Sequence, residues 1–263
     1  MDWFDNIIKT FLDFDAMLQV LPQLLTTGLV NTLIISVFAT VLGIVIGMIL
    51  AIMGVSRTAW LRIPARLYTD IFRGLPAILT ILLIGQGFAR ISQQLFGPSP
   101  YPLGILALSL IAGAYIGEIF RAGIQSIERG QLEACRALGM SYGSAMRLVV
   151  VPQGIRRVLP ALVNQFIAIV KDSSLVYFLG LLVSERELFR VGQDAAVLTG
   201  NLSPLVLAGI FYLIITVPLT HLVNYFDNRF RTGRRKATPP KSGLEEVAEQ
   251  STLSPALAHG ENT

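Results

Sequence analysis

Long apolar stretches separated by short polar segments run through most of the chain. A helix needs about 20 apolar residues to cross a hydrocarbon core of roughly 30 Å, and five stretches are long enough. They lie near residues 26–53, 67–90, 102–121, 160–182 and 204–226, and polar residues interrupt the second and the fourth. The pattern predicts an all-α integral membrane protein with about five transmembrane helices, whose two termini lie on opposite sides of the membrane.

Composition agrees with this fold class. Of the 263 residues, 53% are apolar and only 14% are charged, which is typical of membrane proteins and not of soluble domains of similar length. The single cysteine, Cys135, allows neither an intramolecular disulfide nor a cysteine-ligated metal site. Asp2 and Asp5 stand where a signal peptide would be basic, and no small-residue cleavage site follows, so we expect the first span to remain in the mature protein.

Lys and Arg are distributed unequally between the two sides, and cytoplasmic loops should be enriched in them. The segments after the first, third and fifth spans contain Arg57, Arg62, Arg66, Arg129, Arg136, Arg147, Arg156, Arg157, Arg229, Arg231, Arg234, Arg235, Lys236 and Lys241. The other side contains Lys9, Arg90, Arg186 and Arg190. This distribution predicts an extracytoplasmic N-terminus and a cytoplasmic C-terminus. We interpret the net charge of +4 as topology and contact with anionic lipid, not as nucleic-acid binding.

Two terminal segments flank the transmembrane domain, which we place at residues 24–230. Residues 1–23 form an extracytoplasmic segment with apolar residues at near-helical spacing, so we expect an interfacial helix over residues 3–21. Residues 231–263 mix Pro, Gly, Ser, Glu and Lys without periodicity, which predicts a disordered cytoplasmic tail.

The loop at residues 125–158 is the long polar interruption of the transmembrane domain. Within it, Gln131–Leu138 is a helix-forming run with apolar residues on one face. Gly139 follows, at the position where a glycine commonly ends a helix. The loop therefore predicts a short amphipathic helix outside the bilayer.

Glu133, Ala134, Gly139 and Pro152 resemble the EAA signature of permease subunits of ATP-binding-cassette (ABC) importers. The flanking sequences AYIGEIFRAGIQSIERGQ and PQGIRRVLPALVNQFIAIVKDSSL resemble the polar amino-acid branch of this family, of the histidine, glutamine, arginine and glutamate type. LLTTGLVNTLIIS and YTDIFRGLP match the same branch upstream, in the same order. The resemblance runs from about residue 24 to about residue 230. It departs from the usual pattern at Cys135, commonly alanine, and at Ser173, commonly threonine.

The resemblance implies a type I ABC importer permease fold in a bacterial plasma (inner) membrane. Residues 128–142 would contain a cytoplasmic coupling helix that docks on an ATPase. The residues implied in this coupling are Glu133, Ala134, Arg136, Gly139 and Pro152. The implied partners are ABC ATPase subunits, a second permease subunit, identical or homologous, and an extracytoplasmic amino-acid-binding protein. ATP and Mg would bind to the ATPase, and we expect no cofactor or metal in this chain, which lacks the GxxxxGK phosphate loop.

Lys171 and Asp172 are the strongest candidates for the substrate path. Counted from Pro160 at about 1.5 Å per residue, they lie roughly 16 Å into the bilayer, near its midplane. A charge there costs roughly 2.5–3.5 kcal/mol and normally faces a cavity or a partner. The two charges complement the carboxylate and ammonium of an amino acid, so we place them on the path with the hydroxyls of Ser173 and Ser174. The alternative is structural ion pairing with a neighbouring helix or a second subunit.

Gly74 and Pro76 lie near the start of the second span. Proline removes a backbone donor and glycine allows close approach, and freed carbonyls in a membrane are tolerated where they are buried or line a cavity. We expect either a broken helix that lines the path or an ordinary kink for packing.

Asp70 with Arg73, and Glu118 with Arg121, are acid–base pairs at a three-residue spacing that allows contact on one helix face. We interpret both as structural pairs near cytoplasmic helix ends, with direct gating as the alternative. His221, near the end of the fifth span, is expected to pack or hydrogen-bond locally.

The sequence therefore predicts the permease subunit of an ATP-driven amino-acid importer. An ion-coupled secondary carrier acting through Lys171, Asp172 and Glu118 is the alternative, but that class commonly uses two repeated halves and this sequence has no second half. An intramembrane enzyme is disfavoured because the spans lack a paired nucleophile and base.

Overall fold

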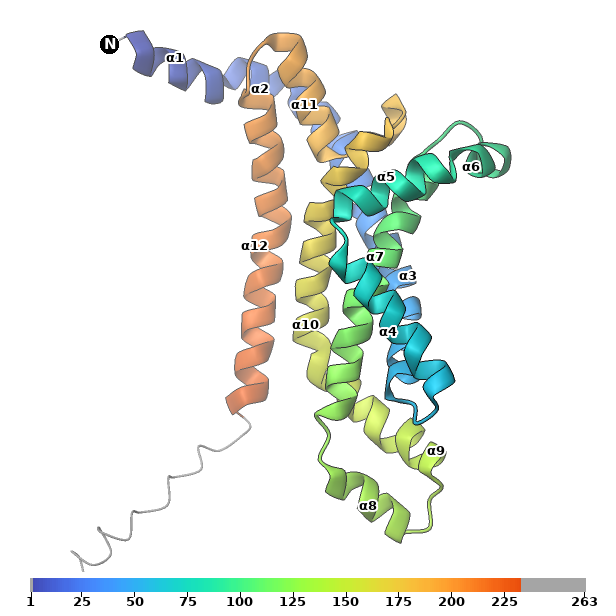
Figure 1. Ribbon diagram of the computed structural model, residues 1–263. Coiled ribbons are helices and arrows are strands. Elements are labelled where there is room, and N and C mark those ends of the chain that lie inside the picture. Colours follow the sequence, from blue (N-terminus) through green and yellow to red (C-terminus); the bar gives the residue numbers. More distant parts are fainter. Residues whose placement is uncertain (1, 233–263) are drawn as a thin grey trace, which may run out of the picture. The chain divides into compact units, whose positions relative to one another are not determined.

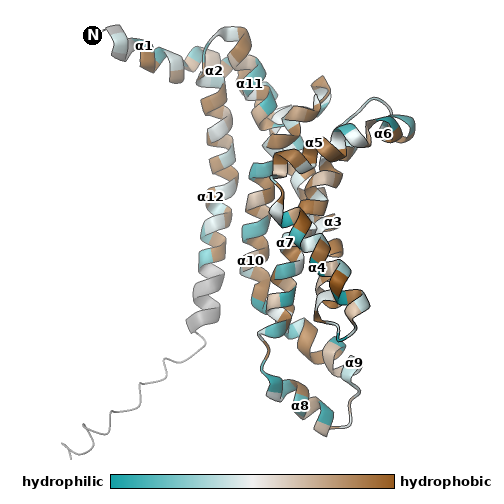
Figure 2. Ribbon diagram, viewed as in Figure 1, coloured by the Kyte–Doolittle hydropathy of each residue, from teal (hydrophilic) through white to brown (hydrophobic). Residues whose placement is uncertain are grey.

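The computed structural model describes residues 2–232 (Figure 1). The predicted disordered tail at residues 231–263 lies outside the described residues except for its first two positions. Every regular element in the described part is helical, as the apolar pattern predicted. Four helical stretches in the described part are long and apolar enough to cross a membrane, and a bent helix pair brings the number to five. Figure 2 shows apolar residues along α3, α5 and much of α12.

The core of the bundle is the contact between α3 (Leu29–Val55) and α7 (Tyr101–Gln125). Glycines let the two backbones approach closely. A Cβ atom placed on Gly43 would lie 2.7 Å from the Cβ of Ala112, and one on Gly47 would lie 2.8 Å from the backbone nitrogen of Gly117. Small residues are the usual means of packing helices in a membrane, where lipid is as apolar as the side chains.

A second helix, α10 (Val151–Asp172), packs against α7 through another pair of glycines. A Cβ atom on Gly123 would lie 2.7 Å from the carbonyl oxygen of Gly154. The buried side chains of Ile116, Phe120 and Ile169 belong to the same core. Since α3 and α10 both pack on α7, α7 is the central helix of the bundle.

The second predicted span is broken. It consists of α4 (Ala59–Gly74) and α5 (Ala77–Gly87), which are bent by 106° at Leu75 and Pro76. Both linking residues have extended ψ angles, 143° and 134°, and Pro76 has no N–H with which to continue a helix. Of the two alternatives for Gly74 and Pro76, the broken helix is present and the ordinary kink is wrong; whether the break lines the path stays a prediction.

The fourth predicted span, residues 160–182, has different bounds in the structure. α10 begins at Val151 and ends at Asp172, and a 3₁₀ helix, η3 (Ser173–Leu179), follows it. The first, third and fifth predicted spans overlap α3, α7 and α12 (Ser203–Thr232). At its N-terminal end α12 packs on α11 (Leu188–Thr199) and α2, around Leu24, Leu188 and Phe211.

The N-terminal segment contains two helices, α1 (Asp2–Phe11) and α2 (Phe14–Gln23), where one was expected. They are separated because the side chain of Asp13 accepts hydrogen bonds from the backbone nitrogens of Asp15 and Ala16 and so starts a new helix. A π-helical turn, η1 (Leu24–Gly28), joins α2 to α3. The location of this segment on the membrane surface stays a prediction.

The remaining elements are short. α6 (Ala89–Phe96) follows α5. α8 (Arg129–Ala137), α9 (Tyr142–Ala145) and the π-helical turn η2 (Met146–Val150) lead from α7 to α10. The 3₁₀ turn η4 (Val183–Glu185) precedes α11. We refer to the end of the bundle where α7 ends and α10 begins as the α8 end, because this connection contains α8 (Figure 1).

Candidate functional site

The helix predicted at Gln131–Leu138 is present as α8, at Arg129–Ala137. It ends because Gly139 has a φ angle of 81°, which side-chain-bearing residues rarely adopt. The backbone nitrogen of Gly139 bonds the carbonyl of Arg136, and that of Met140 bonds the carbonyl of Cys135, at 3.1 Å each. Gly139 is therefore the residue that shapes the end of α8, as the sequence predicted.

One face of α8 packs inward and the other is free. Cys135 is buried and Leu132 is half-buried, whereas Glu133 and Ala134 are exposed and the side chain of Leu138 is 83% exposed. The exposed face of α8, with Glu133 and Ala134, and the exposed Leu138 that follows it are therefore free to contact another protein.

Arg136 and Pro152 are the other two residues that the resemblance implies in coupling. The Arg136 guanidinium donates to the carbonyl of Met140 at 2.9 Å and so closes the turn at the end of α8. Pro152 lies at the start of α10, directly after the π-helical turn η2, with which α10 is continuous. The signature is thus divided between α8 and the start of α10.

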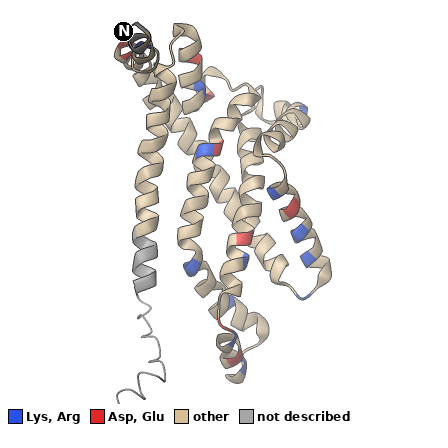
Figure 3. Cartoon of the chain, turned by 60° about the vertical axis from the view of Figure 1, so that its left-hand side comes forward, with Lys and Arg blue, Asp and Glu red and all other residues tan. Residues whose placement is uncertain are grey.

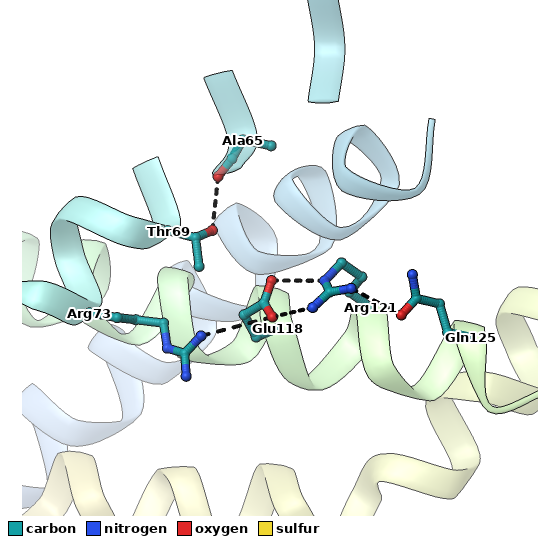
Figure 4. Close-up of polar contacts among 6 residues, drawn as sticks. All are labelled: Ala65, Thr69, Arg73, Glu118, Arg121 and Gln125. Atoms are coloured by element: carbon teal, nitrogen blue, oxygen red, sulfur yellow. Dashed lines mark hydrogen bonds and ion pairs between the residues drawn. The ribbon is translucent and has the colours of Figure 1, made fainter. Parts of the chain in front are cut away.

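Glu118 on α7 lies between two arginines (Figure 4). Its carboxylate accepts hydrogen bonds from Nε of Arg121 at 2.9 Å and from Nη2 at 2.5 Å. Nη1 of Arg73, on α4, lies 3.8 Å from the same carboxylate. Gln125 accepts a further hydrogen bond from Arg121 at 3.0 Å, and the Arg73 guanidinium lies over the ring of Tyr115, 5.4 Å from its centroid.

The predicted Glu118–Arg121 pair is therefore confirmed, whereas the predicted Asp70–Arg73 pair is wrong. Asp70 is exposed, and no ion pair in the described part of the chain includes it. Arg73 points instead to Glu118 on the neighbouring helix. An exposed pair contributes little because water screens it, and the side chain of Glu118 is only 29% exposed.

Lys171 and Asp172 are farther along the bundle than expected. Because α10 begins at Val151 and not near Pro160, twenty residues at about 1.5 Å put Lys171 about 30 Å from the start of the helix. Gly154 packs on Gly123, near the end of α7, and the 3₁₀ helix after Asp172 packs on α7 near its start. The two charges therefore lie toward the end of α7 opposite the α8 end, and their depth in the membrane stays a prediction.

The four consecutive candidates differ in burial. Lys171 is exposed, Asp172 is half-buried and Ser173 is fully buried. The hydroxyl of Ser173 donates to the carbonyl of Val170 at 2.7 Å, and that of Ser174 donates to the carbonyl of Lys171 at 2.8 Å. Both serines thus use their protons within their own helix, and only the lone pairs of these hydroxyls are left for another group.

Sequence reasoning missed a buried carboxylate, that of Glu187 at the start of α11. It is fully buried and accepts hydrogen bonds from the backbone nitrogens of Phe189 and Arg190, at 2.6 and 2.7 Å, and from the hydroxyl of Tyr212 at 3.0 Å. Burial raises the pKa of Glu187 to about 7, and the three donated hydrogen bonds oppose the rise. Its only sequence signal was an acid immediately before an amphipathic helix.

The same region ties α3 to the segment before α11. Asn31 donates to the carbonyls of Ser184 and Arg186, at 2.9 and 3.1 Å. The hydroxyl of Thr32 accepts from the backbone nitrogen of Leu188 at 3.0 Å. This hydrogen-bonded region fixes the segment that follows Lys171 and Asp172 in the chain.

These features define a class: a multi-pass helical membrane protein with one broken span, intramembrane charges and a short exposed helix on a polar loop. The chain belongs to the family of binding-protein-dependent transport system inner membrane components, whose pattern matches residues 43–232. The resemblance inferred from the EAA signature is confirmed. The chain is accordingly a membrane-embedded transport permease of the ABC importer type, and the secondary carrier is disfavoured.

Individual relatives agree with this assignment. The chain is 38% identical to the glutamate/aspartate import permease protein GltK of Escherichia coli O6:H1 over 226 residues, 82% of this chain and 97% of GltK. It is 33% identical to the arginine transport system permease protein ArtQ of Bacillus subtilis, over 84% of this chain and 98% of ArtQ.

Solved structures show the same fold. A crystal structure of an amino acid ABC transporter with histidines matches with a TM-score of 0.72 and 30% identity, over 83% of this chain and 99% of that one. The methionine ABC transporter MetNI, in an inward-facing form, matches with a TM-score of 0.63 at 21% identity, over 83% of this chain and 98% of that one.

Substitution Glu118→Gln tests the acid–base cluster. It leaves the Arg73 and Arg121 guanidiniums without a counter-charge, so the free energy of unfolding should fall by about 1.5–3 kcal/mol, the usual contribution of hydrogen bonds to a charged group. Thermal unfolding of the detergent-solubilised protein measures this. Asp70→Asn, on the same helix as Arg73, is the control and should change stability little. Equal midpoints for the two variants would contradict the ion-pair assignment.

Proposed function

We propose that this chain is the permease subunit of an ATP-driven importer of polar amino acids. It would form the translocation path together with a second permease subunit, identical or homologous, and receive substrate from an extracytoplasmic binding protein. The observation that best supports this is α8, a short helix with an exposed Glu133 and Leu138, held by the positive φ angle of Gly139. Such a helix suits docking on a separate ATPase, which would bind ATP and Mg.

The substrate class follows from the relatives. They are described as permeases for glutamate/aspartate, arginine and, in Rickettsia species, glutamine. These side chains differ in charge, but all free amino acids share an ammonium and a carboxylate. We infer that Lys171 and Asp172 act on these shared groups, with Ser173 and Ser174 beside them, near the end of the bundle opposite the α8 end.

Coupling would work through the helices that α8 connects. α8 follows α7 directly and is joined to α10 through α9 and η2, so a displacement of α8 pulls on two core helices at once. Glu118 would pass this displacement from α7 to α4 through Arg73. The break at Gly74 and Pro76, at the end of α4, would line the path and let α5 change its angle.

The proposed location is the inner membrane of a bacterium, with the N-terminus outside. The excess of arginine at the α8 end supports this orientation, because Lys and Arg are enriched on the cytoplasmic side. Figure 3 shows acidic and basic residues along α4 and around α8.

Transport itself tests the proposal. The complex of this chain, its ATPase and its binding protein, reconstituted in liposomes, should accumulate a radiolabelled polar amino acid when supplied with ATP. Uptake should persist with the proton and sodium gradients collapsed by ionophores, because ATP hydrolysis supplies the energy. A complex whose ATPase cannot hydrolyse ATP is the control. Uptake that depends on the ion gradient and does not depend on ATP would overturn the proposal in favour of the secondary carrier.

Substitution Glu133→Lys tests the docking surface. It reverses one exposed charge on α8 without touching the buried face, so co-purification of the ATPase should fall at least about tenfold, while the permease stays in the membrane; loss of one charge-assisted contact accounts for that factor. Glu128→Lys is the matched control, since Glu128 lies in the same loop and lines the cavity between α4 and α8. Undiminished ATPase association in Glu133→Lys would remove Glu133 from the docking surface.

Substitution Asp172→Asn tests the substrate path. It keeps the side-chain size and removes the negative charge, so the KM for uptake should rise about tenfold or more, as for the loss of one charge-assisted hydrogen bond. Assembly with the ATPase should be unchanged. Asp70→Asn, which removes an exposed carboxylate without an ion pair, should leave uptake as it is. If Asp172→Asn instead weakens assembly and leaves the KM constant, Asp172 has a structural role only.

A further inference from the structure

Two cavities of different character adjoin one another at the α8 end. The first, which we call the arginine cavity, has a volume of about 540 Å³ and lies between α4, the end of α7 and α8; Arg62, Arg66 and Arg129 line it. The second, the apolar cavity, has a volume of about 620 Å³ and is lined by residues such as Ile52, Met53 and Leu61. Both share Val55, Ser56, Ile124, Tyr142 and Met146 as lining residues, so they are neighbours.

The three arginines of the arginine cavity are not tied by short polar contacts to the protein, although Arg66 interacts with Glu118 through its charge. In the described part of the chain no ion pair and no side-chain hydrogen bond includes Arg62, Arg66 or Arg129. Nε of Arg62 is buried and has no acceptor there. Glu128 is the acid that lines the same cavity, so the lining has a net positive charge. A buried donor without an acceptor costs free energy, and a bound anion would remove this cost.

Three nearby charged groups already have partners, whereas Arg147, which lines the apolar cavity, adds to the positive charge of this region. Glu118 is held by Arg121 and Arg73. The Arg57 guanidinium lies over the ring of Tyr142, 5.2 Å from its centroid. Arg157 donates to the carbonyl of Ser126 at 2.6 Å. None of these contacts neutralises the arginine cavity.

The depth of the two cavities fits a lipid headgroup. Val55, which lines both cavities, is the last residue of α3, and Gln125, which lines the arginine cavity, is the last residue of α7. The apolar spans end here, which is where the hydrocarbon core meets the headgroup region. Basic pockets between helices at this level are a known way of binding anionic headgroups.

We propose that the two cavities together bind one anionic phospholipid. The phosphate lies in the arginine cavity, with its oxygens near Arg62, Arg66 and Arg129, and the first part of an acyl chain lies in the apolar cavity. An amphiphile matches a cationic cavity beside an apolar one, whereas free phosphate would fill the first and leave the second empty. Because α4 and α8 both line the arginine cavity, the lipid would link the loop that contains α8 to the broken span.

The test measures which lipid the full-length chain retains from nanodiscs that contain equal amounts of phosphatidylglycerol and phosphatidylcholine. Native mass spectrometry after gentle delipidation should find phosphatidylglycerol enriched on the wild-type protein. One arginine near a headgroup contributes roughly 1 kcal/mol, about a fivefold change, so Arg62→Gln with Arg66→Gln should abolish most of the enrichment. Arg156→Gln is the matched control: Arg156 is exposed on α10 and outside both cavities, so its loss should change nothing.

Two further measurements distinguish lost charge from lost packing, and a bound lipid from bound free phosphate. Arg62→Lys with Arg66→Lys retains the charges and should retain most of the enrichment, which separates charge from loss of packing. Radiolabelled inorganic phosphate, offered to the protein in phosphatidylcholine nanodiscs, tests the other source of the same chemistry. Equal lipid retention by the wild-type and Arg62→Gln/Arg66→Gln proteins would overturn the proposal, as would phosphate binding that depends on both arginines without any preference for phosphatidylglycerol.

Discussion

Close contact between the backbones of α3 and α7 is the constraint on which the rest of the structure depends. Inside a bilayer there is no hydrophobic force to press helices together, so association relies on close packing. Gly43 and Gly47 provide it, since even a methyl group at either position would overlap α7. Once α7 is fixed to α3, it offers its other faces to α10, through Gly123 and Gly154, and to α4, through Glu118.

The two ends of the bundle are held in different ways. Opposite the α8 end, hydrogen bonds donated by Asn31 and Tyr212 and one accepted by Thr32 tie α3 and α12 to the start of α11 and the segment before it. At the α8 end, Arg62, Arg66 and Arg129 line a cavity beside an apolar one, and the buried Nε of Arg62 has no acceptor in the described part of the chain. Groups that are satisfied internally favour one fixed arrangement, so the hydrogen bonds around the start of α11 hold that end of the bundle together.

The sequence predicted what depends on local chemistry. Hydropathy located the spans, and a glycine after an amphipathic run located α8 and its end at Gly139. It failed where a contact joins distant segments: the ion pair of Arg73 is with Glu118, on another helix, and no spacing rule could find it. The start of α10 was missed for a different reason. Arg156 and Arg157 made its first turns resemble a loop, whereas the helix there is continuous with η2.

The position of Glu118 relates the two functional parts of the chain. It lies on α7, the helix that leads directly into α8, and it holds Arg73 in the last turn of α4, next to the break at Gly74 and Pro76. A rigid helix transmits a displacement along its axis, and a charge-assisted contact transmits it sideways as long as both partners stay paired. One carboxylate therefore connects α7, the helix that leads into the proposed docking helix, with the only span that is broken in the described part of the chain.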